Sequence, residues 1–392
     1  MTVKMESLPN RNRIYFLDNL RTFLIFLVVL IHTGLVYESS GIPAAWWIVD
    51  DPATNDLSGI INLVIDIFVM AAIFFVSGYF APSSLRRKGT MEFLKSKFKR
   101  LIIPWIVASL VLLPLYKFLF LYSRGLPQEN WITYFHWSNG IWSQNWLWFL
   151  PVLFLFDVLF VLLSRMGWEN VQIRLRTAIG ISFLSGLIYS VVMDFFQFQG
   201  WTKTFFFDFQ NERLLIYFLV FMVGSLFRKS KAFESKPRSK KLYFAVSSTV
   251  WIPVNIYLGL IIFYLMNPGT LIFSDLVDTF LVQFIFMLSL ISLLFVSINT
   301  FRFYFDKQGK IGRELSRNSY SVYIIHAVVL GILATLMMDS KLPSLLKYLL
   351  VTFATYFLSN LVVSIYRRMS ASFIKKTYIW INGGLTHHET SS

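Results

Sequence analysis

The sequence contains about ten apolar blocks, each long enough to cross a lipid bilayer as a helix. A helix rises about 1.5 Å per residue, so roughly 20 apolar residues cross the hydrocarbon core. The blocks occupy residues 14–36, 57–80, 101–121, 145–164, 174–193, 212–228, 242–266, 275–298, 319–338 and 344–366. Backbone groups in lipid must be bonded within their own segment, which favours helices. The pattern predicts an all-α polytopic membrane protein with about ten transmembrane helices.

The composition agrees with a membrane protein, because 56% of the 392 residues are hydrophobic and 15% are charged. We interpret residues 1–392 as a single integral-membrane domain in which 1–13 and 370–392 are cytoplasmic tails. Asp18 and Arg21 interrupt the first block, so we interpret it as a retained span and not as a cleaved signal peptide. The absence of cysteine excludes disulfides and thiolate catalysis.

Basic residues gather in every second segment between the apolar blocks. The largest clusters lie within residues 86–100, 228–241, 302–317 and 367–376, whereas the alternate segments carry only Arg124, Lys203, Lys341 and Lys347. The positive-inside rule then places both termini in the cytoplasm, with the chain crossing the inner or plasma membrane of the cell. This topology accounts for the net charge of +15, so we expect the lipid bilayer as a partner and no nucleic acid. The segment 81–100 resembles a basic amphipathic helix that lies on the cytoplasmic face.

The first block carries three ionisable residues, Asp18, Arg21 and His32. Such residues are costly at bilayer depth and therefore indicate a functional site. Arg21 and His32 are eleven positions apart, which places them on one helix face about 16 Å apart, so one groove could carry both. Alternatives remain for each residue. Arg21 could simply pair with Asp18 or reach toward the headgroups, and His32 could be a packing histidine.

Depth along the helices predicts two layers of polar residues. Since the ninth block runs in the same direction as the first, we expect His326 at the depth of Arg21. The inner, donor-binding layer would contain Arg21, Ser77, Gly78, Lys97, Arg100, Tyr323 and His326, with Asp18 beside Arg21. The outer layer would contain His32 together with the acceptor-binding residues Tyr37, Glu38, Trp146 and Trp148.

This arrangement is suited to transfer of a group across the membrane. A neutral histidine can take the proton of an attacking hydroxyl, and cationic side chains can hold a donor rich in phosphate. Other interpretations stay open: Tyr323 and His326 could join helices through hydrogen bonds, and Asp66 and Asp157 could be buried polar partners. Aromatic residues near His136 could bind a sugar or anchor the loop at the interface. No metal-ligand spacing occurs, so we expect no metal.

Several motifs, taken in order, resemble the membrane acyltransferase family called acyltransferase 3. The first is FLDNLR followed by the pair Arg21 and His32, and the second is IFFVSGYF at 73–80. FKRLIIPW at 98–105, WLWFLPVLFLF at 146–156 and SYSVYIIH at 319–326 follow. YFLDNLR, FFVSGYF and WFL are most similar to the branch that succinylates periplasmic glucans. The resemblance covers nearly the whole chain.

The resemblance implies an acyl-CoA donor taken from the cytoplasm, no bound cofactor, and an acetyl or succinyl ester formed on an extracytoplasmic glycan. His32 and Arg21 would be the essential pair, with His32 as the base, Arg21 toward the donor and Asp18 fixing the Arg21 rotamer. Lys97 stands where the family often has arginine, which argues against a bidentate phosphate contact there. Some relatives append an extracytoplasmic hydrolase-like domain, which we do not find in this sequence, so we expect either direct transfer or a separate partner protein of glycan synthesis. A transporter that uses Arg21 and His32 as an anion or proton path is the alternative function, although no broken helix or inverted repeat is detectable in the sequence. A third possible function is that of a scaffold for envelope assembly.

Overall fold

The computed structural model describes residues 14–135, 144–168, 172–204, 206–234 and 240–385, and it leaves out the side chains of 134–135 and 373–385. The tail 1–13 and the loop around His136 lie outside the described residues. The helices are α1 (Tyr15–Tyr37), α2 (Asp56–Asp66), α3 (Val69–Lys88), α4 (Thr90–Ser123), α5 (Phe149–Arg165), α6 (Leu175–Phe195), α7 (Leu214–Lys229), α8 (Lys241–Thr249), α9 (Trp251–Met266), α10 (Asp275–Tyr304), α11 (Lys310–Met337) and α12 (Ser344–Leu385). Short 3-10 turns are η1 (Pro43–Ala45), η2 (Trp131–Phe135), η4 (Asn145–Trp148) and η6 (Asn211–Arg213), and an antiparallel pair joins β1 (Trp201–Lys203) to β2 (Asp208–Gln210).

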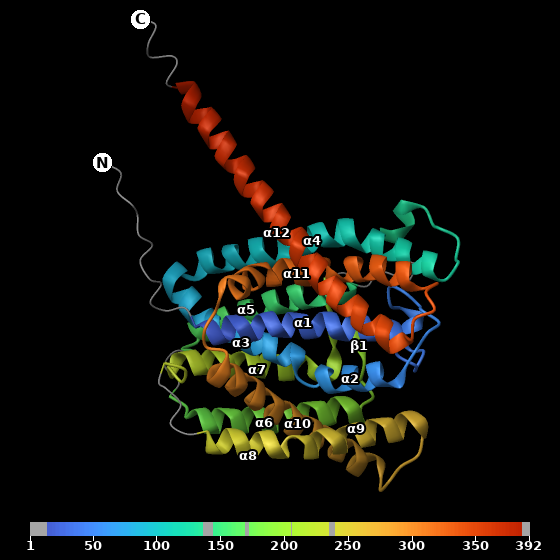
Figure 1. Cartoon of the computed structure of the whole chain (residues 1–392). Helices are drawn as coiled ribbons and strands as arrows, with labels where there is room; N and C mark the ends of the chain where they lie inside the picture. The colour runs from blue at the N-terminus through green and yellow to red at the C-terminus, as the bar shows by residue number, and fades with distance from the viewer. Residues whose placement is uncertain (1–13, 136–143, 169–171, 205, 235–239, 386–392) are drawn as a thin grey trace, which may run out of the picture.

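The helices run side by side in one bundle, with α1 near its centre (Figure 1). α1 contacts α2, α3, α10, α11 and α12, which makes it the element around which the others pack. α6, α8, α9 and α10 form a group on one side, and α4, α11 and α12 lie on the other (Figure 1). The last part of α12 projects beyond the bundle (Figure 1). The chain enters α1 and leaves α12 at the same end of the bundle.

The predicted fold class is confirmed. In the described part of the chain, nine helical segments are long and apolar enough to cross a membrane. α7 has only 16 residues, but it packs along α3 and corresponds to the predicted span 212–228. Counting α7 gives ten crossings, and an even number returns the chain to the side on which it started.

The predicted span 57–80 is interrupted, which the sequence did not reveal. α2 ends at Asp66 and α3 begins at Val69, with a turn at Ile67 and Phe68. A broken backbone in lipid needs new partners for its freed polar groups. Arg213 supplies one of them, because its Nη1 donates to the main-chain oxygen of Asp66 at 3.2 Å.

The prediction of a separate interfacial helix at 81–100 is wrong. α3 continues to Lys88, the chain turns at Gly89 with φ of +73°, and α4 then runs without a break from Thr90 to Ser123. Glycine adopts this left-handed conformation without the steric cost that other residues meet. The basic residues therefore belong to the ends of two long helices that meet at a sharp turn.

α3 and α7 approach each other very closely through small residues. A Cβ atom on Gly78 would lie 2.0 Å from the main-chain oxygen of Phe221, and one on Gly224 would lie 2.2 Å from that of Phe75. Small residues at such positions allow helix backbones to touch in membranes. Gly78 is thus required for packing of α3 on α7.

Candidate active site

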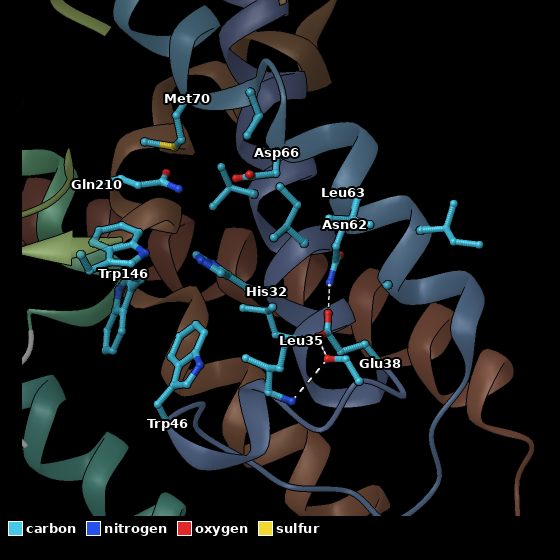
Figure 2. A pocket seen from close by; sticks show the side chains of 18 of the residues that line it. His32, Leu35, Glu38, Trp46, Asn62, Leu63, Asp66, Met70, Trp146 and Gln210 are labelled. Atoms are coloured by element: carbon cyan, nitrogen blue, oxygen red, sulfur yellow. Dashed lines mark hydrogen bonds between the residues drawn. The ribbon is translucent and has the colours of Figure 1, made fainter. Parts of the chain in front are cut away.

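A cavity of about 730 Å³ opens beside α1, within the size range of small-ligand sites. His32, Glu38 and Trp46 line it from α1 and the following loop, and Trp146 faces them across the space (Figure 2). The other lining residues include Asp56, Asn62, Asp66, Met70, Trp148, Trp201, Gln210, Tyr217 and Tyr323. The wall therefore combines aromatic rings with carboxylates and amides.

The His32 ring points into this cavity (Figure 2) and is anchored on its other side by His326. Its Nδ1 lies 2.6 Å from Nε2 of His326, which is fully buried. The two rings are inclined by only 11°, and their centroids are 4.9 Å apart. Nearly parallel planes at this separation fit an in-plane hydrogen bond between the two nitrogens.

The tautomers of both histidines follow from their partners. Nδ1 of His326 lies 2.7 Å from the main-chain oxygen of Tyr323, and a carbonyl oxygen only accepts hydrogen bonds. Nδ1 of His326 therefore carries a proton, which makes Nε2 of the neutral ring an acceptor. His32 must then donate from Nδ1, so its own Nε2 is unprotonated when the ring is neutral. This Nε2 makes no hydrogen bond to the described residues and is available as a base.

The loop after α1 fixes His32 from a third side. Trp47 stacks on the His32 ring at 4.8 Å, and its Nε1 donates to the His32 main-chain oxygen at 2.8 Å. The loop is held in turn by Lys347, whose Nζ forms a buried ion pair with Asp51 at 3.1 Å. Sequence reasoning missed these contacts, because no pattern in the sequence pairs Trp47 with His32 or Lys347 with Asp51.

Three of the four predicted acceptor-binding residues line the cavity. Glu38, Trp146 and Trp148 do so, whereas Tyr37 is fully buried and is not part of the wall. The placement of Tyr37 in the cavity is therefore wrong. It follows Val36 on the packed face of α1, while Glu38 begins the loop and turns toward Asn62, whose Nδ2 donates to it at 3.2 Å (Figure 2).

Several polar residues of the cavity were not predicted as site residues. Asp56, Asn62 and Gln210 come from α2 and β2, which only the folded chain brings beside α1. Asp66 was predicted as a buried polar partner, and it does pair with Arg213 at 2.6 Å, yet its carboxylate also faces the cavity (Figure 2). The described lining residues include the carboxylates of Glu38, Asp56 and Asp66 and no lysine or arginine, and Arg213 behind the wall offsets the charge of Asp66.

Arg21 lies at a different level of the bundle, beside its predicted partner. Its Nη2 contacts Asp18 at 3.2 Å and the main-chain and side-chain oxygens of Ser316 at 3.4 and 3.3 Å. The prediction that His326 shares the depth of Arg21 is wrong, since His326 meets His32 instead. The error came from the start of the ninth span: α11 begins at Lys310, nine residues before the predicted 319. α1 and α11 then run in register, with eleven residues from Arg21 to His32 and ten from Ser316 to His326.

The expected single groove carrying Arg21 and His32 is also absent from the described residues. The cavity ends at Val28, Val69 and Met70, and Arg21 is not part of its wall. Leu24 and Ile25, both buried, fill the space between the two levels of α1. The structure thus shows a cavity open to His32 and sealed from Arg21.

The remaining predicted donor-binding residues are dispersed. Lys97 forms an ion pair at 2.9 Å with Asp157, whose side chain is fully buried, and Ser77 donates to Ile73 within α3. Arg100 is exposed, and its main-chain oxygen accepts a hydrogen bond from Tyr320.

Tyr323 lines the cavity and donates to the main-chain oxygen of Trp146, so it lies in the His32 layer and not at the depth of Arg21.

No cluster of three or more residues suited to a metal ion occurs in the part of the chain that the structure describes.

Comparison with known proteins places the chain in a family. Residues 14–364 match the acyltransferase domain family. The chain is 28% identical over 238 residues to glucans biosynthesis protein C of Salmonella schwarzengrund, covering 57% of this chain and 60% of that protein. It is 32% identical over 153 residues to the protein of the same name in Salmonella typhi, covering 38% of each chain. The chain thus spans less than two thirds of these relatives, and no solved structure matches it significantly. Since the family match covers most of its length, this multi-pass membrane protein belongs to the acyltransferase 3 family.

Proposed function

We propose that this acyltransferase moves an acetyl or succinyl group from acyl-CoA to a hydroxyl of an extracytoplasmic glycan, with Nε2 of His32 as the base. The observation that carries the proposal is the tautomer chain from Tyr323 through His326 to His32. It supplies an unprotonated nitrogen on a cavity wall that bears aromatic and carboxylate groups. The hydroxyl oxygen attacks the acyl carbon, its proton passes to Nε2, and the C–S bond breaks to release the thiol of CoA after protonation.

The cavity wall suits a carbohydrate acceptor. Trp148 and Trp201 meet edge to face at 5.4 Å, and both line the cavity with Trp146. Such rings offer flat apolar faces to a sugar, while Glu38 and Asp66 offer acceptors to its hydroxyls. The name of the relatives, glucans biosynthesis protein C, supports a glycan acceptor. Partner proteins of glycan synthesis would deliver such an acceptor to a membrane site.

The donor would bind at the basic end of the bundle, where the cationic side chains gather. Arg21 lies on that side of His32, and the ends of α3 and α7 supply Arg86, Lys88, Arg228 and Lys229. Guanidinium and ammonium groups are the usual partners of phosphates, of which CoA carries several. By the positive-inside rule, this end of the bundle would face the cytoplasm from the inner membrane. The cytoplasm is the compartment that contains acyl-CoA.

The experiment measures label transfer from acyl-CoA to glycan in membrane vesicles. His32→Gln keeps an amide near His326 but has no base, so we expect transfer to fall by about 10²–10⁴-fold. Thr33→Val is the matched control. Thr33 is the residue after His32, is buried, and among the described residues its hydroxyl bonds only the main-chain oxygen of Val29 in the same helix. Activity of His32→Gln equal to that of the control, at equal membrane levels, would remove His32 from the mechanism.

A transporter remains the second candidate, because the interruption between α2 and α3 lies at the cavity and broken helices are typical of transport sites. Uptake of a labelled substrate into sealed vesicles without ester formation would decide for transport. Ester formation that needs acyl-CoA on the basic side only would decide for the proposed transfer.

A further inference from the structure

A second cavity of about 350 Å³ lies apart from the one at His32 and shares no lining residue with it. α6, α7 and α10 enclose it, together with Phe75 of α3. Among its described lining residues only Ser182, Asn299 and Arg302 are polar. An apolar cavity does not retain water, and an apolar occupant would restore the dispersion contacts that an empty space lacks.

The cavity has the length of one bilayer leaflet. Its lining follows α7 from Ile216 to Phe227, eleven residue steps or about 16 Å of helix, and α10 from Met287 to Arg302, fifteen steps or about 22 Å, which is about the thickness of one leaflet with its headgroups. Half of the hydrocarbon core measures about 15 Å. Most of the lining side chains are only half-buried, as expected for a slot between helices that is open on one side to the surrounding lipid.

A cation marks one end of this slot. Arg302 lies in the last turn of α10, its Nη2 donates to the main-chain oxygen of Ala232 at 3.2 Å, and its guanidinium lies over the ring of Phe233. A guanidinium has five N–H donors in a fixed plane, so an arginine that already has protein partners can also bind a phosphate oxygen. Arg228 and Lys229 end α7 at the same face, with Glu234 3.7 Å from Arg228.

We propose that this cavity binds one acyl chain of an anionic glycerophospholipid from the leaflet at the basic face, with the phosphate on Arg302. The apolar wall takes a chain and not a polar solute, its length matches one leaflet, and the charge at its end is opposite to that of the headgroup. The lipid would fill the space between α6 and α10 on one side and α7 on the other. This inference is independent of the proposed acyl transfer.

Native mass spectrometry of the purified full chain tests the site, with phosphatidylglycerol and phosphatidylcholine of identical chains as probes. We expect one tightly bound phosphatidylglycerol, preferred over phosphatidylcholine by about tenfold, as one charge-assisted hydrogen bond gives. Arg302→Gln should remove the preference. Arg313→Gln is the control, since Arg313 is an exposed cation of the same face outside the cavity.

Leu219→Trp provides the second variant, because the larger ring fills the slot and should abolish the tightly bound lipid of either headgroup. It also tests the site if Arg302→Gln fails to fold. Equal retention of both lipids by the unmodified chain would overturn the headgroup assignment. An unchanged number of bound lipids in folded Leu219→Trp would place the lipid on the outer surface and overturn the cavity as the site.

Discussion

Replacing His326 tests whether the hydrogen bond to His32 sets the tautomer of the base. The bond joins His32 Nδ1 to the only acceptor that the described residues offer it, and His326 is fully buried. Leaving a buried N–H without an acceptor costs about 1–3 kcal/mol. At 1.36 kcal/mol for each factor of ten, the productive tautomer then becomes roughly 5- to 150-fold less populated. We therefore expect a fall in kcat of that size, smaller than the loss on removing the base itself.

Two amide variants of His326 separate the hydrogen bond from the bulk of the ring. In His326→Gln the side-chain oxygen lies about where Nε2 of His326 was, so it can accept the hydrogen bond from Nδ1 of His32. The shorter amide of His326→Asn does not reach that position. Activity should fall clearly further in the Asn variant, with the KM for the acceptor unchanged in both, because neither change alters the cavity wall.

The assay is label transfer in vesicles at matched protein levels, with the double variant His32→Ala plus His326→Asn as the control. If His326 acts only through His32, the double variant transfers no less than His32→Ala alone, since the base is already missing. A double variant that loses activity further would refute the relay, as would equal kcat values for the Gln and Asn variants.

Other predictions concern stability and the position of the base. Lys97→Met should destabilise the protein by about 3–5 kcal/mol because it leaves the Asp157 carboxylate buried without a partner, and adding Asp157→Leu should restore the melting temperature in detergent. Transfer that stays absent in that restored double variant would reveal a donor-binding role for Lys97. Gly78→Ala should lower the melting temperature because its Cβ meets a backbone oxygen at 2.0 Å, whereas Gly180→Ala, with nothing within 4 Å, should not; equal melting temperatures would contradict the close packing. Trp47→Phe keeps a ring stacked on the His32 imidazole but removes the hydrogen bond from Trp47, so kcat should fall about tenfold or less, as one hydrogen bond allows, and the fold should persist.

Features that depend on a local pattern could be predicted from the sequence, whereas contacts between residues far apart in the chain could not. Apolar length located the spans, because this effect acts within a single segment, whereas the direction that the basic clusters assign to them stays a prediction. The contact of Arg21 with Asp18 also follows from their spacing of three residues. Pairs such as Lys97 with Asp157, or Lys347 with Asp51, join residues that are 60 and 296 positions apart, and no pattern within one segment encodes them.

The misplaced depth of His326 shows a more general limit. Hydropathy locates where a helix becomes apolar, not where it begins, and the polar first turns of α11 from Lys310 are helical without being apolar. An error of nine residues amounts to about 13 Å along the axis, nearly the distance from Arg21 to His32. The levels of Arg21 and His32 are so close along the helix axis that an error of this size assigns residues such as His326 to the wrong level.

The seal between those levels constrains any reaction that uses both. Buried Leu24, Ile25 and Val28 separate Arg21 from the cavity, as a protein that keeps two compartments apart requires. The proposed transfer therefore requires these side chains to part when the donor binds, with the energy of phosphate binding at the basic face offsetting the lost packing. The break between α2 and α3 lies at the same level, since Val69 and Met70 form the inner end of the cavity. A span that is already interrupted there can bend at its turn with less loss of helical hydrogen bonds than an unbroken helix, so the turn beside these buried side chains is a suitable hinge for the movement.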